Sequence, residues 1–142
     1  MSGATDRVAR WGKLIRRHHF LLLKTVALLA AIRLTLTFRG YRTVLARIRR
    51  IEPRRQAGIP IDMLAWAVQV MAPFVPQATC LTQALTLRYL AAREGQDCTI
   101  RIGVKQKSGE AFEAHAWVMA ENVMILGGQE ERVESFTPIV DL

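Results

Sequence analysis

The sequence predicts an α+β fold in which helices come first and an antiparallel sheet follows. Apolar residues recur at helical spacing up to about residue 93, and from residue 99 they alternate as they do in strands. Glycines and prolines separate these segments. The chain has 142 residues, of which 51% are hydrophobic, so we expect one domain with a substantial core.

Five helices are expected before the sheet. Gly40 marks a break after the second helix, Pro60 suits the first turn of the fourth, and Gly95 is a stop signal for the fifth. The proline-containing stretch 72–78 predicts a loop before the fifth helix. The expected helices span residues 7–17, 20–38, 41–51, 60–71 and 80–93.

Three strands are expected to form an antiparallel meander after these helices. Ser108 and Gly109 suit the first turn, and Glu121 with Asn122 suits the second. The tail, residues 129–142, is interpreted as a surface loop, with contact to the basic half or to a peptide cleft as alternatives. The expected strands span residues 99–107, 111–120 and 123–126.

Charge divides the chain into two parts. Residues 1–58 carry a net charge of +12, whereas residues 59–142 carry −4. We interpret 1–58 as a basic helical region within the same compact unit as 59–142. A solvated helical face explains this charge, and so does docking to an acidic partner or an anionic membrane. The sequence has no recognised nucleic-acid-binding motif, and nucleic acid is not an expected partner.

The apolar stretch 20–38 is expected to be a buried helix rather than a membrane span. Lys24 and Arg33 interrupt it and leave only eight uncharged residues between them, whereas a span needs about 20 apolar residues. Two cysteines cannot form a disulfide framework or a four-thiolate metal site. We therefore expect a cytoplasmic protein with reduced thiols and no metal, and membrane-surface association is the weaker alternative.

Cys80 lies where a loop becomes a helix. Thr79 is a good N-cap residue, which puts Cys80 at the first helical position. Unpaired N–H groups and the helix dipole stabilise a thiolate there. The alternative is a small cysteine that fills space beside Leu81 and Ala84. Cys98, between the fifth helix and the first strand, is expected to be incidental.

His115 is the candidate base for this cysteine. His18 and His19 lie among arginines, whereas His115 lies on the second strand and shares a face with Glu113 and Trp117. Cys-His sites bring together residues that are distant in sequence. A structural histidine is the alternative. The opposite face carries apolar side chains expected to pack on the helices, namely Phe112, Ala114, Ala116 and Val118.

Four motifs together resemble one family: "TCLTQAL", "IGVKQ", "AHAWVM" and "ILGG". The sequence resembles the lasso-peptide leader peptidases, which belong to the transglutaminase-like, papain-related cysteine proteases. The resemblance covers about residues 21–137. Its most specific parts are Cys80-Leu81 with Ala84, Gly103-Val104, and the segment 115–118.

The resemblance implies removal of the leader from a ribosomally made lasso-peptide precursor. A macrolactam synthetase then closes the ring on the freed core peptide, and no cofactor is implied for the peptidase. Residues 59–142 would form the transglutaminase-like catalytic core. We expect a split form that works with a separate leader-recognition protein, with the basic helices as a docking surface.

The resemblance also implies roles for individual residues. Cys80 would be the nucleophile, and His115 would be the base that later protonates the leaving amine. The N–H of Cys80 would be one oxyanion donor, and Gln77 is a candidate for another.

The residue that orients His115 is the departure from the family pattern. If Ala120 pairs with Val123, then His115 lies opposite Gly128 and the expected acid position falls near Gly127. Neither glycine has a side chain to hold the ring. The open alternatives are Glu113, Glu121, Gln129, Glu130, a backbone carbonyl or water.

Three other functions stay open on the sequence. A non-catalytic adaptor on the same fold would bind a peptide or a synthetase, and the absent acid favours it. An acyltransferase of the transglutaminase type would use the same dyad and let an amine replace water. A membrane-surface protein without catalysis would use only the basic, leucine-rich helices.

Overall fold

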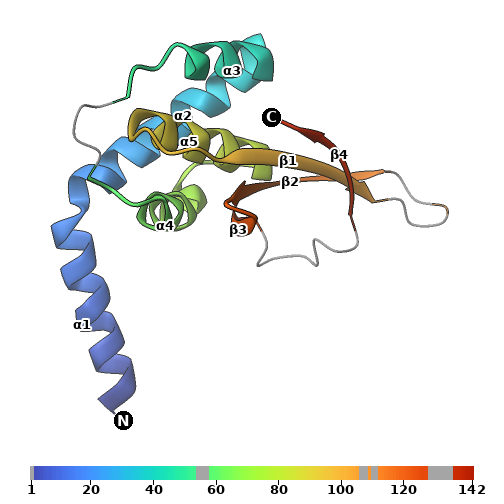
Figure 1. Cartoon of the computed structure of the whole chain (residues 1–142). Coiled ribbons are helices and arrows are strands. Elements are labelled where there is room, and N and C mark those ends of the chain that lie inside the picture. Colours follow the sequence, from blue (N-terminus) through green and yellow to red (C-terminus); the bar gives the residue numbers. More distant parts are fainter. Residues whose placement is uncertain (1, 54–57, 106–108, 110–111, 128–135) are drawn as a thin grey trace.

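The computed structural model describes residues 2–53, 58–105, 109, 112–127 and 136–142 (Figure 1). Five helices precede a four-stranded antiparallel sheet, as the α+β prediction requires, and a 3₁₀ turn, η1, follows the fourth helix. The helices and η1 are α1 Ser2–Arg17, α2 His19–Arg39, α3 Tyr41–Arg49, α4 Ile61–Met71, η1 Ala72–Phe74 and α5 Cys80–Arg93. The strands are β1 Thr99–Lys105, β2 Glu113–Ala120, β3 Val123–Leu126 and β4 Thr137–Asp141.

Helix α5 lies between the other helices and the sheet. It contacts α2 and α4 as well as β1 and β2, so apolar residues are needed around most of its circumference. Leu85 and Leu87 are fully buried. The hydroxyl of the buried Thr86 donates to the carbonyl oxygen of Thr82 at 2.8 Å, which removes the cost of burying it. The element that begins at Cys80 is therefore held firmly in the core.

The sheet has the strand order β3-β2-β1-β4, with all neighbours antiparallel. The predicted meander of the first three strands is confirmed. The interpretation of the whole tail as a loop is wrong, because Thr137–Asp141 forms β4 on the edge beside β1. Pro138 lies within β4, and an edge strand tolerates proline because one row of its N–H groups faces away from the sheet.

An ion pair joins β4 to β1. The guanidinium of Arg101 donates to both carboxylate oxygens of Asp141, at 2.8 and 3.0 Å. This side-chain hydrogen bond, together with the charge of the guanidinium, lowers the pKa of Asp141. Both side chains are exposed, so the pair contributes little to stability.

The register between β2 and β3 contains a bulge. Ala120 pairs with Val123, as expected, but Val118 pairs with Leu126 because β3 has one extra residue. The regular count behind the prediction for His115 therefore does not hold at Val118, and Gly128 itself lies outside the described residues. The bulge changes which part of the chain after β3 reaches His115.

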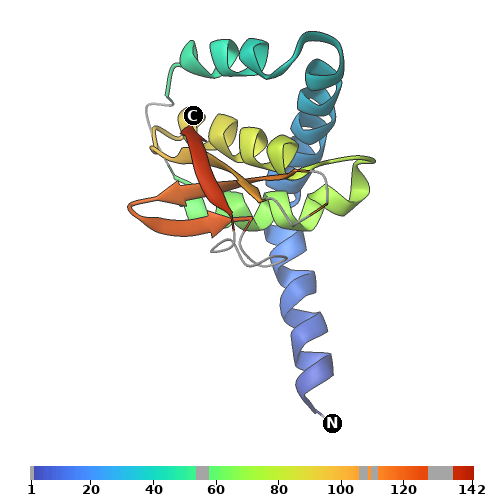
Figure 2. The same ribbon diagram turned by 90° about the vertical axis from the view of Figure 1, so that its right-hand side faces the viewer.

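Helices α1 and α2 differ in how much of their surface packs against the rest of the fold. Helix α2 buries one side, including Leu22, Leu29 and Ile32, against the rest of the fold. Helix α1 begins earlier than expected and extends away from the body, as Figures 1 and 2 show. Exposed residues line most of its described surface.

Candidate active site

Cys80 occupies the first position of α5, as the sequence predicts. Thr79 is the N-cap, and its hydroxyl oxygen accepts the N–H of Thr82 at 3.4 Å. Within the described part of the chain, the N–H groups of Cys80 and Leu81 have no protein acceptor. Two main-chain donors and the positive end of the helix dipole therefore lie beside the half-buried Cys80 thiol.

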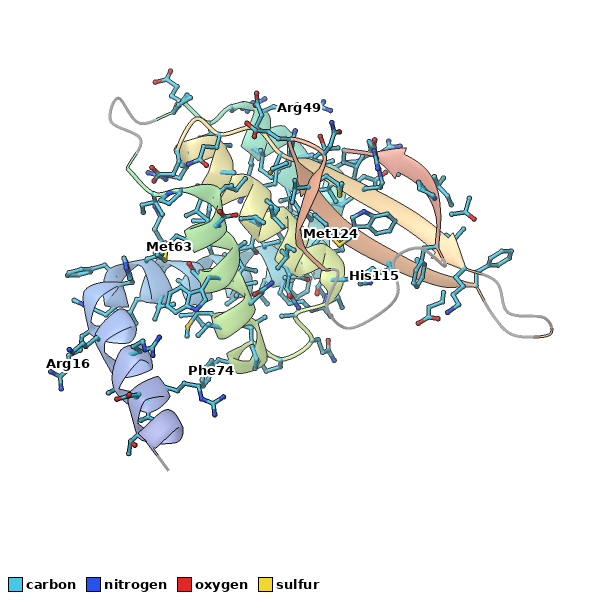
Figure 3. All side chains as sticks on the ribbon, turned by 60° about the horizontal axis from the view of Figure 1, so that its bottom comes forward. Arg16, Arg49, Met63, Phe74, His115 and Met124 are labelled. Carbon is cyan, nitrogen blue, oxygen red and sulfur yellow. The ribbon has the colours of Figure 1, made fainter. Side chains whose placement is uncertain are left out.

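Cys80 and His115 line the same cavity, although 35 positions separate them in the sequence. Its volume is about 550 Å³. In Figure 3, His115 extends from β2 beside the helical layer. The cavity thus joins the start of α5 to the edge of the sheet at β2 and β3. Its lining consists of Gln69, Ala72, Pro73, Ala78, Thr79, Cys80, Gln83, His115, Ala116, Leu126 and Gly127.

A main-chain carbonyl holds the ring of His115. His115 Nε2 lies 2.6 Å from the carbonyl oxygen of Gly127. A carbonyl can only accept, so Nε2 is the protonated nitrogen and Nδ1 is the basic one. The sequence left several groups open as the partner that orients His115. Among the described residues, the group in contact with its Nε2 is a backbone carbonyl. Within the part of the chain that the structure describes, this main-chain carbonyl rather than a third side chain fixes the tautomer of His115.

The backbone at Gly127 explains why a glycine lies there. Its φ of +91° is a conformation that residues with a side chain rarely adopt. A Cβ atom at this position would lie 3.0 Å from the carbonyl oxygen of Ala116 and 3.0 Å from Cβ of Trp117. Only glycine brings the chain this close to β2, and this approach delivers its carbonyl to His115.

Two aromatic rings pack against His115. Trp117 stacks on it with ring centroids 6.0 Å apart, and Phe136 contacts it at 5.4 Å. Trp117 is only 3% exposed. Its ring fits because β1 has Gly103 beneath it, where a Cβ atom would lie 2.7 Å from Cη2 of the indole. The two rings restrict the His115 ring and shield part of it from water.

The other predicted site residues lie elsewhere. Gln77 is exposed and does not line the cavity, and its side-chain oxygen accepts from Arg33 at 2.6 Å. Glu113 is exposed at the start of β2, and no contact joins it to the His115 ring. Glu121 lies in the β2–β3 turn and lines a second cavity. Gln129 and Glu130 lie outside the described residues.

Gln69 is a site residue that the sequence reasoning missed. It is exposed on α4 and lines the cavity with Cys80. Its side-chain amide has no protein partner among the described residues, whereas the amide of Gln83 donates to the carbonyl of Ala78 at 3.0 Å. One signal was available, because Gln69 is the single polar residue in the apolar stretch 63–74. Phe136 was also missed, since it lies in the tail interpreted as a loop.

Cys98 differs from Cys80 in its surroundings. It is buried and lines the second cavity rather than the one at His115. Burial raises the pKa of its thiol to about 11, with Arg88 opposing this and Asp97 adding to it. Its thiolate is scarce near neutral pH, and this supports the interpretation of Cys98 as incidental.

Metal chemistry has no ready site in the described structure. Within the described ranges, no group of three His, Cys, Asp or Glu side chains is arranged to hold a metal ion. The polar groups around the cavity are a thiol, an imidazole, a threonine hydroxyl and side-chain amides. Such a set suits nucleophilic attack on an acyl carbon.

Comparison with known families agrees with this arrangement. Residues 20–141 match the family model described as the transglutaminase-like superfamily. The chain belongs to this superfamily, whose members are typically enzymes that use a cysteine and a histidine. Membership thus suggests an enzyme of the cysteine protease or transglutaminase type. Searches among curated proteins and among solved structures find no match.

Proposed function

We propose that the protein is a cysteine peptidase that removes the leader from a lasso-peptide precursor. The observation that carries the proposal is the cavity shared by Cys80 and His115, with the ring of His115 held through Nε2 by the Gly127 carbonyl. The sequence motifs around these residues supply the choice of precursor. A leader-recognition protein and a macrolactam synthetase are its proposed partners.

The first chemical step forms a thioester. Nδ1 of His115 takes the proton from Sγ of Cys80, and the thiolate attacks the carbonyl carbon of the last leader residue. The C–N bond then breaks, and the imidazolium gives its proton to the departing amine of the core peptide. The leader stays attached to Cys80 as an acyl group.

Main-chain and side-chain donors are available for the oxyanion of this step. The unpaired N–H groups of Cys80 and Leu81 lie at the start of α5. We add the amide of Gln69 to this set in place of Gln77, because Gln69 lines the cavity and Gln77 is bonded to Arg33 outside it. Donors of this kind stabilise the charge that develops in the transition state.

The second step regenerates the enzyme. His115 takes a proton from water, the hydroxide attacks the thioester carbonyl, the C–S bond breaks, and the imidazolium returns its proton to Sγ of Cys80. The products are a leader with a free carboxylate and the Cys80 thiol. If an amine attacks in place of water, the same steps give acyl transfer, which is the transglutaminase-type alternative.

Mass spectrometry of the processed precursor tests the proposal. A lasso-peptide precursor is incubated with the protein and a leader-recognition partner. Wild type is expected to release a leader with a C-terminal carboxylate, and Cys80→Ala and His115→Ala are expected to release none. Thr79→Ser, which retains the capping hydroxyl, serves as the matched control and is expected to stay active.

The same spectra separate the alternatives. A leader carrying an added amine such as cadaverine would identify an acyltransferase. Leader removal that persists in both Cys80→Ala and His115→Ala would overturn the dyad. An inactive wild type that still binds the precursor with every partner present would favour the adaptor.

A further inference from the structure

Helix α2 carries an unbroken apolar face on the side away from the core. Its members follow one another at intervals of three or four residues, so they form one line along the helix. Every member is exposed. We call this the α2 stripe, and it consists of Phe20, Leu23, Ala27, Ala31, Leu34 and Phe38.

The exposure of the α2 stripe is unusual for a helix that also contributes to the core. Phe20 and Phe38, at its two ends, are each 78% exposed, and Leu34 is 59% exposed. At 1.5 Å per residue the stripe is about 27 Å long. A continuous apolar face of this length on a protein surface is typical of an interaction site.

The surroundings of the α2 stripe are strongly cationic. Residues 7–51 contain twelve Lys and Arg and neither Asp nor Glu. Arg16 precedes the stripe and Arg39 follows it, and both are exposed. Because the charge has one sign, the occupant of this face must be anionic or neutral.

Helix α1 adds a second basic and amphipathic segment next to the stripe. It extends from the start of α2 away from the body (Figure 2). Arg10, Lys13 and Arg16 are exposed on it, and Val8 is 72% exposed. Basic amphipathic helices of this kind bind membrane surfaces or acidic partners.

We propose that α1 and the α2 stripe bind the surface of an anionic membrane. Apolar side chains enter the boundary between headgroups and acyl chains, while the flanking arginines contact anionic headgroups. A second copy of the chain fits this face less well, because pairing would bring two regions of net charge +12 together. A partner protein is also less favoured, because the stripe has no polar side chain to set the register of a specific interface.

The helix lies on the membrane rather than crossing it. Helix α2 is long and apolar enough to span a bilayer by length and composition alone. However, Leu22, Leu29 and Ile32 on its other side are buried in the core with α4 and α5. A spanning α2 would remove these side chains from the core, whereas surface binding uses only the side that is already exposed.

Vesicle flotation tests the membrane proposal independently of any catalytic activity. The full chain is mixed with vesicles of phosphatidylcholine alone, or with about a quarter of phosphatidylglycerol. Wild type is expected to float with the anionic vesicles and not with the neutral ones. Phe20→Ser with Phe38→Ser is expected to weaken this binding at least tenfold, because two apolar anchors are lost.

A matched double variant controls for the loss of exposed phenylalanine. Phe74 and Phe112 are 72% and 69% exposed and lie outside α1 and α2, so Phe74→Ser with Phe112→Ser is expected to bind like wild type. Circular dichroism confirms that each variant is folded.

Three results would overturn the proposal. Wild type could fail to float with the anionic vesicles. The two double variants could bind equally well. Wild type could instead dimerise through the stripe, so that the Phe20→Ser, Phe38→Ser variant alone is monomeric in sedimentation while vesicle binding is absent.

Discussion

The substitution Gly127→Ala tests directly how His115 is oriented. The new Cβ atom would lie 3.0 Å from the carbonyl oxygen of Ala116 and 3.1 Å from Cα of Trp117, and φ is +91°. The conformation costs about 1–2 kcal/mol for a residue with a side chain. Overpacking against backbone costs about 1–3 kcal/mol more. The chain after β3 is therefore expected to shift and to carry its carbonyl away from His115.

The expected loss of activity follows from the hydrogen bond at Nε2. A hydrogen bond to a charged group contributes about 1.5–3 kcal/mol, and the imidazolium is charged when it protonates the leaving amine. Losing this bond should lower kcat/KM for leader removal by roughly 10- to 150-fold. The assay is the rate of leader release, followed by mass spectrometry, beside a thermal melt.

Gly109→Ala is the matched control for this substitution. Gly109 also has a positive φ, +82°, but a Cβ atom there meets nothing within 4 Å. It should lose stability from strain alone and keep its activity. Nitrogen NMR of labelled histidine gives a second readout, because wild type should show His115 protonated at Nε2. A folded Gly127→Ala variant with full activity, or a wild-type ring protonated at Nδ1, would refute the reasoning.

Four further predictions concern residues around the site and the second cysteine, Cys98. Gly103→Ala should push the indole of Trp117 off β1, because the new Cβ would lie 2.7 Å from Cη2 of the indole. Tryptophan fluorescence should then be quenched more strongly by a soluble quencher, and activity should fall. Unchanged quenching would contradict this prediction. Gln69→Ala should lower kcat about 100-fold or more with little change in KM, as for a lost oxyanion donor; an unchanged kcat would remove Gln69 from the mechanism. In the folded protein at pH 8, iodoacetamide should modify Cys80 well before the buried Cys98, and peptide mapping would detect the reverse order. The pKa of Cys98 is about 11 against 9.0 for an ordinary thiol, so the native state holds this proton more tightly than the unfolded chain does. The stability that results is complete below pH 9 and is lost as pH rises towards 11. Denaturant melts should therefore show the free energies of unfolding of wild type and Cys98→Ala converging over that range.

Local signals in the sequence were sufficient for most of the elements. The capping threonine at 79 and the stop at Gly95 bounded α5 correctly, because capping depends on neighbouring residues. The alternation from residue 99 predicted the meander for the same reason. Strand β4 was missed because its partner β1 lies about 35 residues away, and such pairing has little local signature.

The candidate site divides in the same way. Cys80 and His115 became candidates because helix capping and strand alternation mark their positions, and the family motifs then implied their roles. The sequence could not show that the carbonyl of Gly127 is the group that orients His115. A bulge in β3 shifts the register, and every residue has a main-chain carbonyl, so the residue type does not indicate this role. Likewise, the choice of Gln69 over Gln77 as the candidate oxyanion donor requires the packing of α4 and α2. Gln69 on α4 lines the cavity, whereas Gln77 accepts a hydrogen bond from Arg33 on α2.

The most direct measurement of the central claim is the mass of the enzyme after an acid quench. Wild type mixed briefly with the precursor or its leader-derived ester should gain the mass of the leader acyl group, and peptide mapping should locate it on Cys80. Cys80→Ser with Cys98 intact should gain no thioester. An acyl group on Cys98, or turnover without any acyl group on Cys80, would contradict the account.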